Sequence, residues 1–385
     1  MQEGESVCRN FIKRVITGAF LASGIVAIFT LCPRIATSAL MSVLLAVCMW
    51  EFSWLMARIK PHLIDGPPLD LEQYALASLA AQWQFSSRSI VVALFALTMT
   101  IVVVAFFIGF YYLVGKDALS FDEETLYSSF VPYVAVSASA GAVCAGLSPT
   151  KVDAANIALG QVSFLVIILD TVLCPYEDTH CTYVIDSAFV LTCECILMGV
   201  LHLSTAATMK EAYIGLLLDQ IGIVYLVGLV QILSNFVDLS AVSEGRKVVL
   251  VLLFAVWAAD SGSYFTGHVL RWVGYTRYHK LAPHLSPNKD VEGTLGGIVF
   301  ALAAAFIVTY VLNMATAAVT KTLLTIVAIL FSRCGDLFES LLKRAADVKD
   351  SSQLLPGHGG LLDRVDALLF ACVVFAVYNI HIQLI

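Results

Sequence analysis

Residues 90–114 read IVVALFALTMTIVVVAFFIGFYYLV, an apolar run without a single charged residue. A helix rises about 1.5 Å per residue, so about 20 apolar residues cross the hydrocarbon core of a bilayer. In lipid such a run must satisfy its backbone hydrogen bonds internally, and a single helix does so. The run therefore predicts a membrane-spanning helix, and the remainder of the chain can be compared with it.

The composition of the whole chain agrees with this interpretation. Of the 385 residues, 59% are hydrophobic and only 13% are charged, with a mean hydropathy of +0.86. Soluble domains carry about 25% charged residues, so a surface this poor in charge indicates lipid as the main solvent. A cytosolic enzyme, a disordered protein and a disulfide-stapled secreted module are excluded. The net charge of −7 gives no indication of a nucleic-acid partner.

Apolar runs of spanning length recur along the chain and predict an all-α, polytopic helical bundle of about 9–11 transmembrane helices. The expected spans are 15–33, 35–56, 90–114, 129–148, 156–174, 184–207, 213–236, 247–270, 294–313, 317–336 and 367–385. If the amino terminus lies inside the cell, 17 of the 22 lysines and arginines fall on cytoplasmic segments. The positive-inside rule favours this orientation.

The polar motifs concentrate in the last part of the chain. We divide the sequence into an amino-terminal transmembrane region, 1–246, and a carboxy-terminal region, 247–385. The second region contains two polar loops, 271–293 and 337–366, which the charge distribution places on the cytoplasmic side. The proline-containing segment 57–89 is expected to be an interfacial connection.

The beginning of the second loop has helical spacing. Asp336, Ser340, Lys343 and Asp347 are four, three and four residues apart, which places them on one face of a helix. Such a face is ordinarily only solvated. Asp336, however, lies near the membrane boundary, where an unpaired charge costs on the order of 2–3 kcal/mol, and this favours a functional role.

A glycine-rich turn with carboxylates follows. Residues 356–360 read PGHGG, a loop whose backbone N–H groups can approach an anion closely. Asp363 and Asp366, with Arg364 between them, can bind a hard cation such as Mg²⁺, whose coordination is usually completed by water and substrate phosphates. Acids for a metal, cations for phosphate oxygens and glycines for close approach indicate phosphoryl or nucleotidyl transfer. No Walker A loop is present, so a P-loop ATPase is excluded.

These motifs together resemble a known family. The stretch 340–366 reads S-x-x-K-R-x-x-x-x-K-D-x-x-x-x-x-P-G-H-G-G-x-x-D-R-x-D, which resembles the signature of the phosphatidate cytidylyltransferases (CDP-diacylglycerol synthases). SPNKDVEG at 286–293 and the Asp260-Ser261 and Tyr264-Phe265 pairs resemble two further family elements. The resemblance covers roughly 247–385 and is weak before it. Asp290, Val291 and Gly267-His268 with the basic stretch after it depart from the family pattern.

The resemblance implies a nucleotidyltransferase that converts CTP and phosphatidate into CDP-diacylglycerol and pyrophosphate during phospholipid biosynthesis. It implies Mg²⁺, with room for a monovalent cation, and a homodimer in a bacterial inner (cell) membrane. Metal ligands would be Asp336, Asp363, Asp260 and Asp366. Catalytic residues would be Lys289, Lys343, Arg344, Asp336 and Asp363. Substrate-binding residues would be Ser286, Glu292, Ser340, Lys349, His358, Gly359, Gly360 and Arg364.

Three alternatives remain at this point. A CTP-dependent polyprenol or phytol kinase would move the γ-phosphoryl group instead of the cytidylyl group. A secondary transporter would use intramembrane acids, for which Asp170, Glu194 and Asp219 are candidates. An inactive scaffold would not need the full set of acids and cations. His202, His268 and His381 are interpreted as packing or interface residues, and Cys174 and Cys181 could form a disulfide on an oxidising side.

Overall fold

The computed structural model describes residues 23–28, 30–31, 34–66, 74–82, 88–115, 123–173, 185–238, 244–355 and 359–383, and most of these residues are helical. Within these ranges, nine helices are long and apolar enough to cross a membrane. The all-α polytopic fold predicted from the apolar runs is thereby confirmed. The chain forms two compact units, one of residues 33–234 and one of residues 235–385 with 1–32, which we describe separately.

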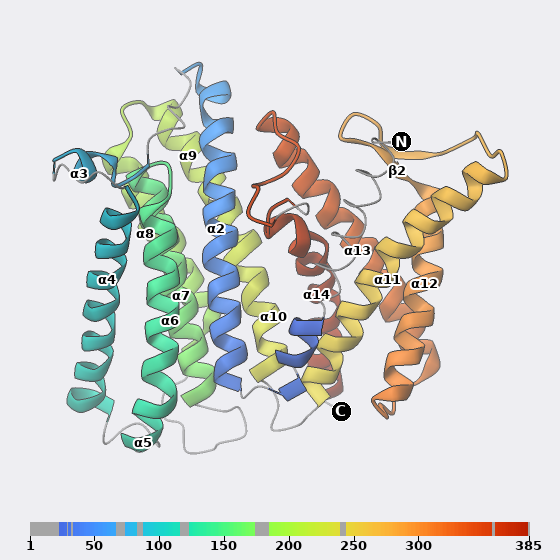
Figure 1. The fold of residues 1–385 in the computed structure, drawn as a ribbon, viewed down its shortest axis with the longest axis horizontal. Coiled ribbons are helices and arrows are strands. Elements are labelled where there is room, and N and C mark those ends of the chain that lie inside the picture. The colour runs from blue at the N-terminus through green and yellow to red at the C-terminus, as the bar shows by residue number, and fades with distance from the viewer. Residues whose placement is uncertain are drawn as a thin grey trace, which may run out of the picture. The chain divides into compact units, whose positions relative to one another are not determined.

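The unit formed by residues 33–234 is a bundle of long helices and short connecting elements (Figure 1). Helices α6 and α7 pack against α2, and α4 packs against α6. The elements are α2 (Arg34–Ile64), α3 (Ala77–Gln82), α4 (Arg88–Phe110), η1 (Tyr111–Gly115), α5 (Glu123–Thr125), η2 (Leu126–Phe130), α6 (Val131–Gly146), α7 (Lys151–Leu173), α8 (Ser187–Thr205), α9 (Met209–Gly222), η3 (Ile223–Gly228) and α10 (Leu229–Asp238).

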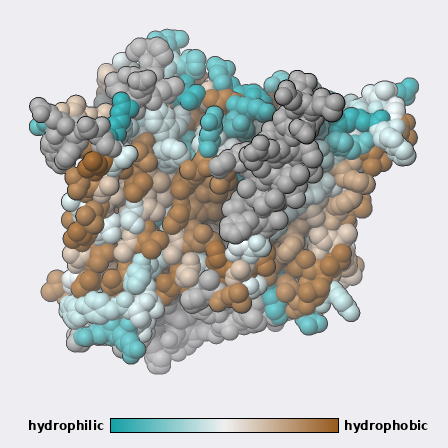
Figure 2. Space-filling model, viewed as in Figure 1, coloured by the Kyte–Doolittle hydropathy of each residue, from teal (hydrophilic) through white to brown (hydrophobic). Residues whose placement is uncertain are grey.

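Helix α4, continued by η1, covers the apolar run 90–114, and α4 presents apolar side chains outward. Ile101, Val102 and Phe106 are 58%, 61% and 74% exposed. Figure 2 shows hydrophobic residues along the sides of the helices and hydrophilic residues near helix ends. An exposed surface of this kind is stable in hydrocarbon and not in water, which is the property that the composition predicted.

An ionic cluster is buried among α2, α7, α8 and α9. The Lys60 Nζ lies 3.4 Å from Asp153 Oδ1 and 3.8 Å from Asp219 Oδ1. His202 Nε2 pairs with the other oxygen of Asp219. His202 is buried, as a packing residue is expected to be, but it is not isolated, because its partner lies 17 residues away on another helix. Asp219 thus has two partners within this unit, the Lys60 ammonium and the His202 imidazole.

Replacing Lys60 with methionine is expected to lower the free energy of unfolding by about 3 kcal/mol, because Asp153 and Asp219 would remain buried without their cation. Lys210→Met is the matched control. Its ion pair with Asp65 is exposed on both sides, and such surface pairs contribute about 0–1 kcal/mol. Thermal denaturation in detergent should show a lower midpoint for the first variant only. Equal midpoints for the two variants would contradict the buried cluster.

The second unit contains the polar motifs on four helices and a hairpin (Figure 1). Its elements are α11 (Glu244–Trp272), β1 (Lys280–Ala282), β2 (Ser286–Asp290), α12 (Val291–Val311), α13 (Ala318–Ala345) and α14 (Leu362–Gln383). The two strands are antiparallel, with Lys280 opposite Asp290. Helix α11 packs along α12, and α13 packs along α14.

Small residues allow α11 and α12 to approach closely. Gly293, Gly297, Ala301 and Ala305 recur every four residues of α12 and are all buried. This is the small-xxx-small pattern that brings helix backbones together in membranes, where apolar burial between helices gives little driving force. Asp290 caps α12, since its Oδ1 accepts from the Gly293 N–H at 2.8 Å. The hairpin is thereby fixed to the start of α12.

The polar loops are shorter than the sequence predicted. Helix α11 continues to Trp272, α13 continues to Ala345 and α14 begins at Leu362, so helices enter both 271–293 and 337–366. The extension of α13 is stabilised by Lys343, which pairs with Glu339 one turn before it. Asp347 was expected on the α13 face, but it lies beyond the helix with φ 53°. Helix α2 likewise extends to Ile64, into the expected connection 57–89.

Some predictions fall outside the described residues. The first expected span, 15–33, is described only at 23–28 and 30–31. Cys174, Cys181 and His358 are among the residues that the structure does not describe, and so is the side chain of His381.

Candidate functional site

Lys289 connects the hairpin to α13. Its Nζ lies 2.6 Å from Asp336 Oδ1, and it donates to the Asp336 carbonyl oxygen at 2.9 Å and to Ser340 Oγ at 3.0 Å. Lys289 comes from β2, whereas Asp336 and Ser340 are one turn apart on α13. Because Asp336 and Ser340 share one helical face, both can bind the same lysine, which lies 47 residues before Asp336. Lys289 and Asp336 were both expected in the site.

Arg333 extends this arrangement to α11. Its guanidinium lies 3.3 Å from Asp260 Oδ1 and 3.6 Å from Asp336 Oδ2, and it also donates to Ser263 Oγ. We call Asp260, Lys289, Arg333, Asp336 and Ser340 the Lys289 cluster. In this cluster two carboxylates share two cations, so each charged group has a partner of opposite sign.

Lys343 forms the centre of a second group, two turns further along α13. Its Nζ lies 2.6 Å from Glu339 Oε2 and 2.6 Å from Asp363 Oδ1. The side chains of Glu339 and Asp363 are 1% and 5% exposed, so this cation is shared by two buried carboxyl groups. It also fixes the start of α14 against the end of α13.

Asp363 shapes the glycine loop that precedes α14. Its Oδ2 accepts from Ser351 N at 3.0 Å and from Gly360 N at 2.8 Å. Burial opposes the ionisation of Asp363, but hydrogen bonds and the Lys343 charge outweigh it and hold the carboxyl pKa below its ordinary value. We call Glu339, Lys343, Ser351, Gly360 and Asp363 the Lys343 cluster.

Gly359 is required by this loop for two reasons. Its φ is +80°, a conformation that residues with a Cβ rarely adopt, and it pairs with Leu355 in an isolated bridge. A Cβ on Gly359 would also lie 2.7 Å from Asp363 Oδ2. The glycines of the PGHGG motif were expected to contact an anion. In this structure the described pair, Gly359 and Gly360, approaches the Asp363 carboxylate.

Asp366 connects the two clusters electrostatically. It is 5% exposed, and the charges of both Asp336 and Lys343 act on it. The backbones of α13 and α14 also lie close together at this point, since a Cβ on Gly335 would lie 2.5 Å from the Asp366 carbonyl oxygen. The tight packing of α13 on α14 therefore gathers the predicted acids, and the two clusters occupy one neighbourhood of the second unit.

Four further predicted residues, Arg344, Glu292, Lys349 and Arg364, lie outside the two clusters. Arg344 is exposed and donates to the Leu285 and Val348 carbonyl oxygens, so it joins α13 to the hairpin turn. Glu292 accepts from the His279 backbone N–H and, at 2.7 Å, pairs with its imidazole. The structure thus gives Glu292 a partner on the hairpin side and shows no contact between it and either cluster. The other two predicted cations, Lys349 and Arg364, are exposed, and Arg364 acts electrostatically on Asp260.

Glu339 and Arg333 were missed by the sequence analysis. The sequence does point to Glu339, because it lies four residues before Lys343 and can pair with it on a helix. The sequence points less strongly to Arg333, through the rule that a cation near the end of a membrane span needs a partner there. Both were overlooked because the expected helical face was drawn through Asp336, Ser340, Lys343 and Asp347.

The carboxylates fit a hard cation by their chemistry. Oxygen ligands suit Mg²⁺, and the buried Glu339 Oε1 has no hydrogen-bond partner among the residues that the structure describes. In the same ranges no three His, Cys, Asp or Glu side chains converge as a ready-made ligand set. Mg²⁺ commonly binds through one or two carboxylates with water and substrate phosphates, so this donor set is compatible with it.

Gly297 controls how closely Arg333 approaches α11. A Cβ there would lie 2.5 Å from Ser263 Oγ and 2.7 Å from the Ala259 carbonyl oxygen, the two groups that receive Arg333. Gly297→Ala is therefore expected to cost about 1–3 kcal/mol of stability by overpacking and to reduce turnover. Gly109 is the matched helical control, because a Cβ added there would meet nothing within 4 Å. Gly109→Ala should therefore lower neither the denaturation midpoint nor turnover, and normal turnover in Gly297→Ala would contradict this packing.

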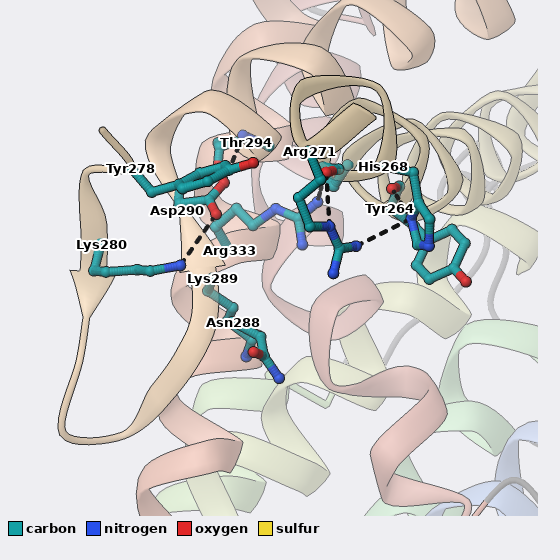
Figure 3. A pocket seen from close by; sticks show the side chains of 13 residues that line it. Tyr264, His268, Arg271, Tyr278, Lys280, Asn288, Lys289, Asp290, Thr294 and Arg333 are labelled. Atoms are coloured by element: carbon teal, nitrogen blue, oxygen red, sulfur yellow. Dashed lines mark hydrogen bonds and ion pairs between the residues drawn. The ribbon is translucent and has the colours of Figure 1, made fainter. Parts of the chain in front are cut away.

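A pocket of about 550 Å³ adjoins the Lys289 cluster (Figure 3). It lies among α11, the hairpin, α12 and α13, and Lys289 and Arg333 contribute to its lining. Its volume is within the range of about 300–1,000 Å³ that is typical of small-molecule sites. The Lys289 cluster is thus accessible to a ligand from this side.

The comparisons with known proteins agree with this geometry. Phosphatidate cytidylyltransferase of Haemophilus influenzae is 41% identical over 139 residues, which are 35% of this chain and 46% of the relative. The Bacillus subtilis protein of that name is 44% identical over 126 residues, 33% of this chain and 45% of its own. The matched segment spans about half the length of these relatives. A family model described as "Cytidylyltransferase family" matches residues 12–381, and the chain therefore belongs to the cytidylyltransferase family.

Proposed function

We propose that this protein transfers the cytidylyl group of CTP to phosphatidate and releases pyrophosphate, forming CDP-diacylglycerol. One observation supports this most strongly. Lys289 and Lys343, from separate elements, lie at buried or half-buried carboxylates in one neighbourhood of a membrane-embedded unit. The relatives named phosphatidate cytidylyltransferase support the choice of substrates.

The proposed reaction is a single in-line displacement. An ionised phosphate oxygen of phosphatidate attacks the α-phosphorus of CTP and forms the new P–O bond. The bond between the α-phosphorus and the oxygen that bridges to the β-phosphorus breaks, and that oxygen leaves with its electron pair on pyrophosphate. The nucleophile is already ionised, so no general base is required, and His358 is not assigned that role.

The main obstacle is repulsion between two polyanions, and cationic side chains can reduce it. Lys289 would act on the leaving pyrophosphate or the nucleotide, while Lys343, Arg344, Lys349 and Arg364 would neutralise phosphate oxygens. Asp336 and Asp363, with Asp260, Asp366 and Glu339, would hold Mg²⁺. When bound there, Mg²⁺ supplies charge neutralisation and alignment of the phosphates.

The location of the site suits two substrates of opposite solubility. Phosphatidate keeps its acyl chains in the bilayer, whereas CTP is soluble in the cytosol. The charge asymmetry of the loops supports a site on the cytoplasmic side, and the bacterial relatives support an inner membrane. An interfacial site at the ends of α11, α13 and α14 would then receive one substrate from each phase.

Product analysis with purified protein tests the proposal. With phosphatidate and Mg²⁺, CTP labelled in its cytidine or at the α-phosphorus should label the lipid, and CTP labelled at the γ-phosphorus should not. A lipid kinase would give the reverse pattern. A chelator should abolish labelling, and excess Mg²⁺ should restore it. Failure of the α-label to enter the lipid, with folded protein and both substrates present, would reject the proposed function.

A further inference from the structure

The pocket beside the Lys289 cluster has a strongly cationic lining. Arg271 of α11, Lys280 of β1, Lys289 of β2 and Arg333 of α13 all contribute to it (Figure 3). Asp290 is the one acidic residue among its described lining residues. Both Asp290 oxygens are engaged, because Oδ1 caps α12 and Oδ2 lies 3.4 Å from Lys280. Lys289 and Arg333 are paired with Asp336 and Asp260 behind the lining, so among the described residues the positive charge left over in the pocket is that of Arg271, and it suits an anion.

Arg271 is the cation whose charge is least compensated. Among the described residues, its contacts are the Gly267 carbonyl oxygen at 3.0 Å and His268 Nδ1 at 3.2 Å, and no carboxylate pairs with it. The same Nδ1 lies 2.9 Å from the Tyr264 carbonyl oxygen. An Nδ1 that donates a proton to Tyr264 cannot also accept one from Arg271. The terminal N–H groups of Arg271 are then available to a ligand in the pocket.

The surface next to the pocket is apolar and aromatic. On α11, Tyr264, Phe265 and Trp272 are 69%, 55% and 88% exposed, and on α12, Leu295 and Val299 are 58% and 64% exposed. Tyrosine and tryptophan are enriched where a membrane meets water, and apolar residues beside them face the hydrocarbon. Arg271 is adjacent in sequence to Trp272, which places the free guanidinium at the level of lipid head groups.

These observations favour a lipid ligand over a soluble nucleotide. A nucleotide base can stack on a single exposed aromatic ring. Acyl chains can also use the aliphatic surface along α11 and α12, which a base cannot, while the head group enters the pocket. A phosphomonoester carries a charge of about −1.5 to −2 near pH 7, more than the single charge of a phosphodiester, so a pocket of several cations prefers it.

We propose that Arg271, together with Lys280, binds the phosphomonoester head group of the lipid substrate and holds it beside Lys289 and Arg333. The inference rests on the proposed function and deepens it, because it assigns the Arg271 side of this pocket to the lipid and leaves Lys289, at its boundary, to the nucleotide or the leaving pyrophosphate. Arg271 lies in the stretch where the sequence departs from the family pattern.

The kinetic test compares Arg271→Gln with Arg277→Gln in mixed micelles. Arg277 is an exposed arginine on the connection that follows α11 and is not part of the pocket lining, so it is a charge-matched control. Loss of a charge-assisted hydrogen bond costs about 1.5–3 kcal/mol, so Arg271→Gln should raise the KM for phosphatidate by at least about tenfold. The KM for CTP should stay unchanged. Arg271→Lys should be intermediate, because it keeps the charge but loses the planar fork.

Binding without turnover provides an independent measurement. Native mass spectrometry of the protein with phosphatidate, and with phosphatidylglycerol as the phosphodiester control, needs no CTP. Wild type and Arg277→Gln should retain phosphatidate preferentially, and Arg271→Gln should lose this preference while eluting normally in size-exclusion chromatography. If Arg271→Gln does not elute as folded protein, Arg271→Lys provides the comparison.

The outcomes separate the two proposals. Phosphatidate binding that depends on Arg271, without formation of CDP-diacylglycerol, would reject the proposed function and support the lipid pocket. Normal product formation with an unchanged phosphatidate KM in Arg271→Gln, or a raised KM for CTP alone, would overturn the lipid pocket.

Discussion

Asp363→Asn is expected to lower kcat by about 10²–10³-fold while the protein remains folded in the membrane. Every hydrogen-bond contact of Asp363 described above comes from a donor: Lys343 at Oδ1, and Ser351 and Gly360 at Oδ2. Asparagine has one acceptor oxygen and one NH₂ group, so one side would place donors against donors. Lys343 or the glycine loop must then move.

The fold should tolerate Asp363→Asn because apolar residues anchor α14. Leu369, Cys372 and Phe375 are almost fully buried. Turnover with labelled CTP and the elution profile in detergent together measure the effect. Asp347→Asn is the control, since this carboxylate lies just beyond α13 and outside both clusters. A folded Asp363→Asn protein with near-normal turnover would remove Asp363 from the site.

Lys343→Met is expected to reduce both stability and turnover. Methionine has a similar reach but no charge, so Glu339 and Asp363 would remain buried without the cation that lies 2.6 Å from each. Removing one partner of a buried ionic group costs about 3–5 kcal/mol. The thermal denaturation midpoint in detergent should fall, and turnover should fall with it because a cation for phosphate oxygens is lost.

A double variant separates the structural role of Lys343 from its chemical role. In Glu339→Gln with Lys343→Met, one of the two buried acids can no longer carry a charge, so part of the lost stability should return. Turnover should not return, because the phosphates would still lack the cation. Recovery of turnover together with stability would show that Lys343 acts only by supporting the fold.

Local sequence properties were sufficient for the helical spans. The run at 90–114 predicted a span close to the observed helix, because length and hydrophobicity alone determine whether a segment can cross a bilayer. Helix ends were less predictable. Helix α13 continues to Ala345 because Lys343 finds partners on its own helix and on α14, and hydropathy contains no information about such partners.

The candidate site was only partly predictable. Asp336, Lys343 and Asp363 could be named from their residue types, spacing and resemblance to a family. Their pairing could not, since Lys289 and Asp336 are far apart in the sequence and meet only because the hairpin is fixed to the start of α12. Arg333 reaches Asp260 because glycine at 297 leaves room between α11 and α12.

The sequence by itself determined that this protein is a helical membrane protein with an acidic and basic motif near its carboxyl terminus. These conclusions follow from hydrophobicity, spacing and residue chemistry, which are properties of short segments. Only the tertiary structure decided that Glu339 shares Lys343 with Asp363, and that Arg271 faces a pocket without a carboxylate partner among the described residues. Ion pairing depends on distances of a few ångströms between separate elements, and helix packing sets those distances.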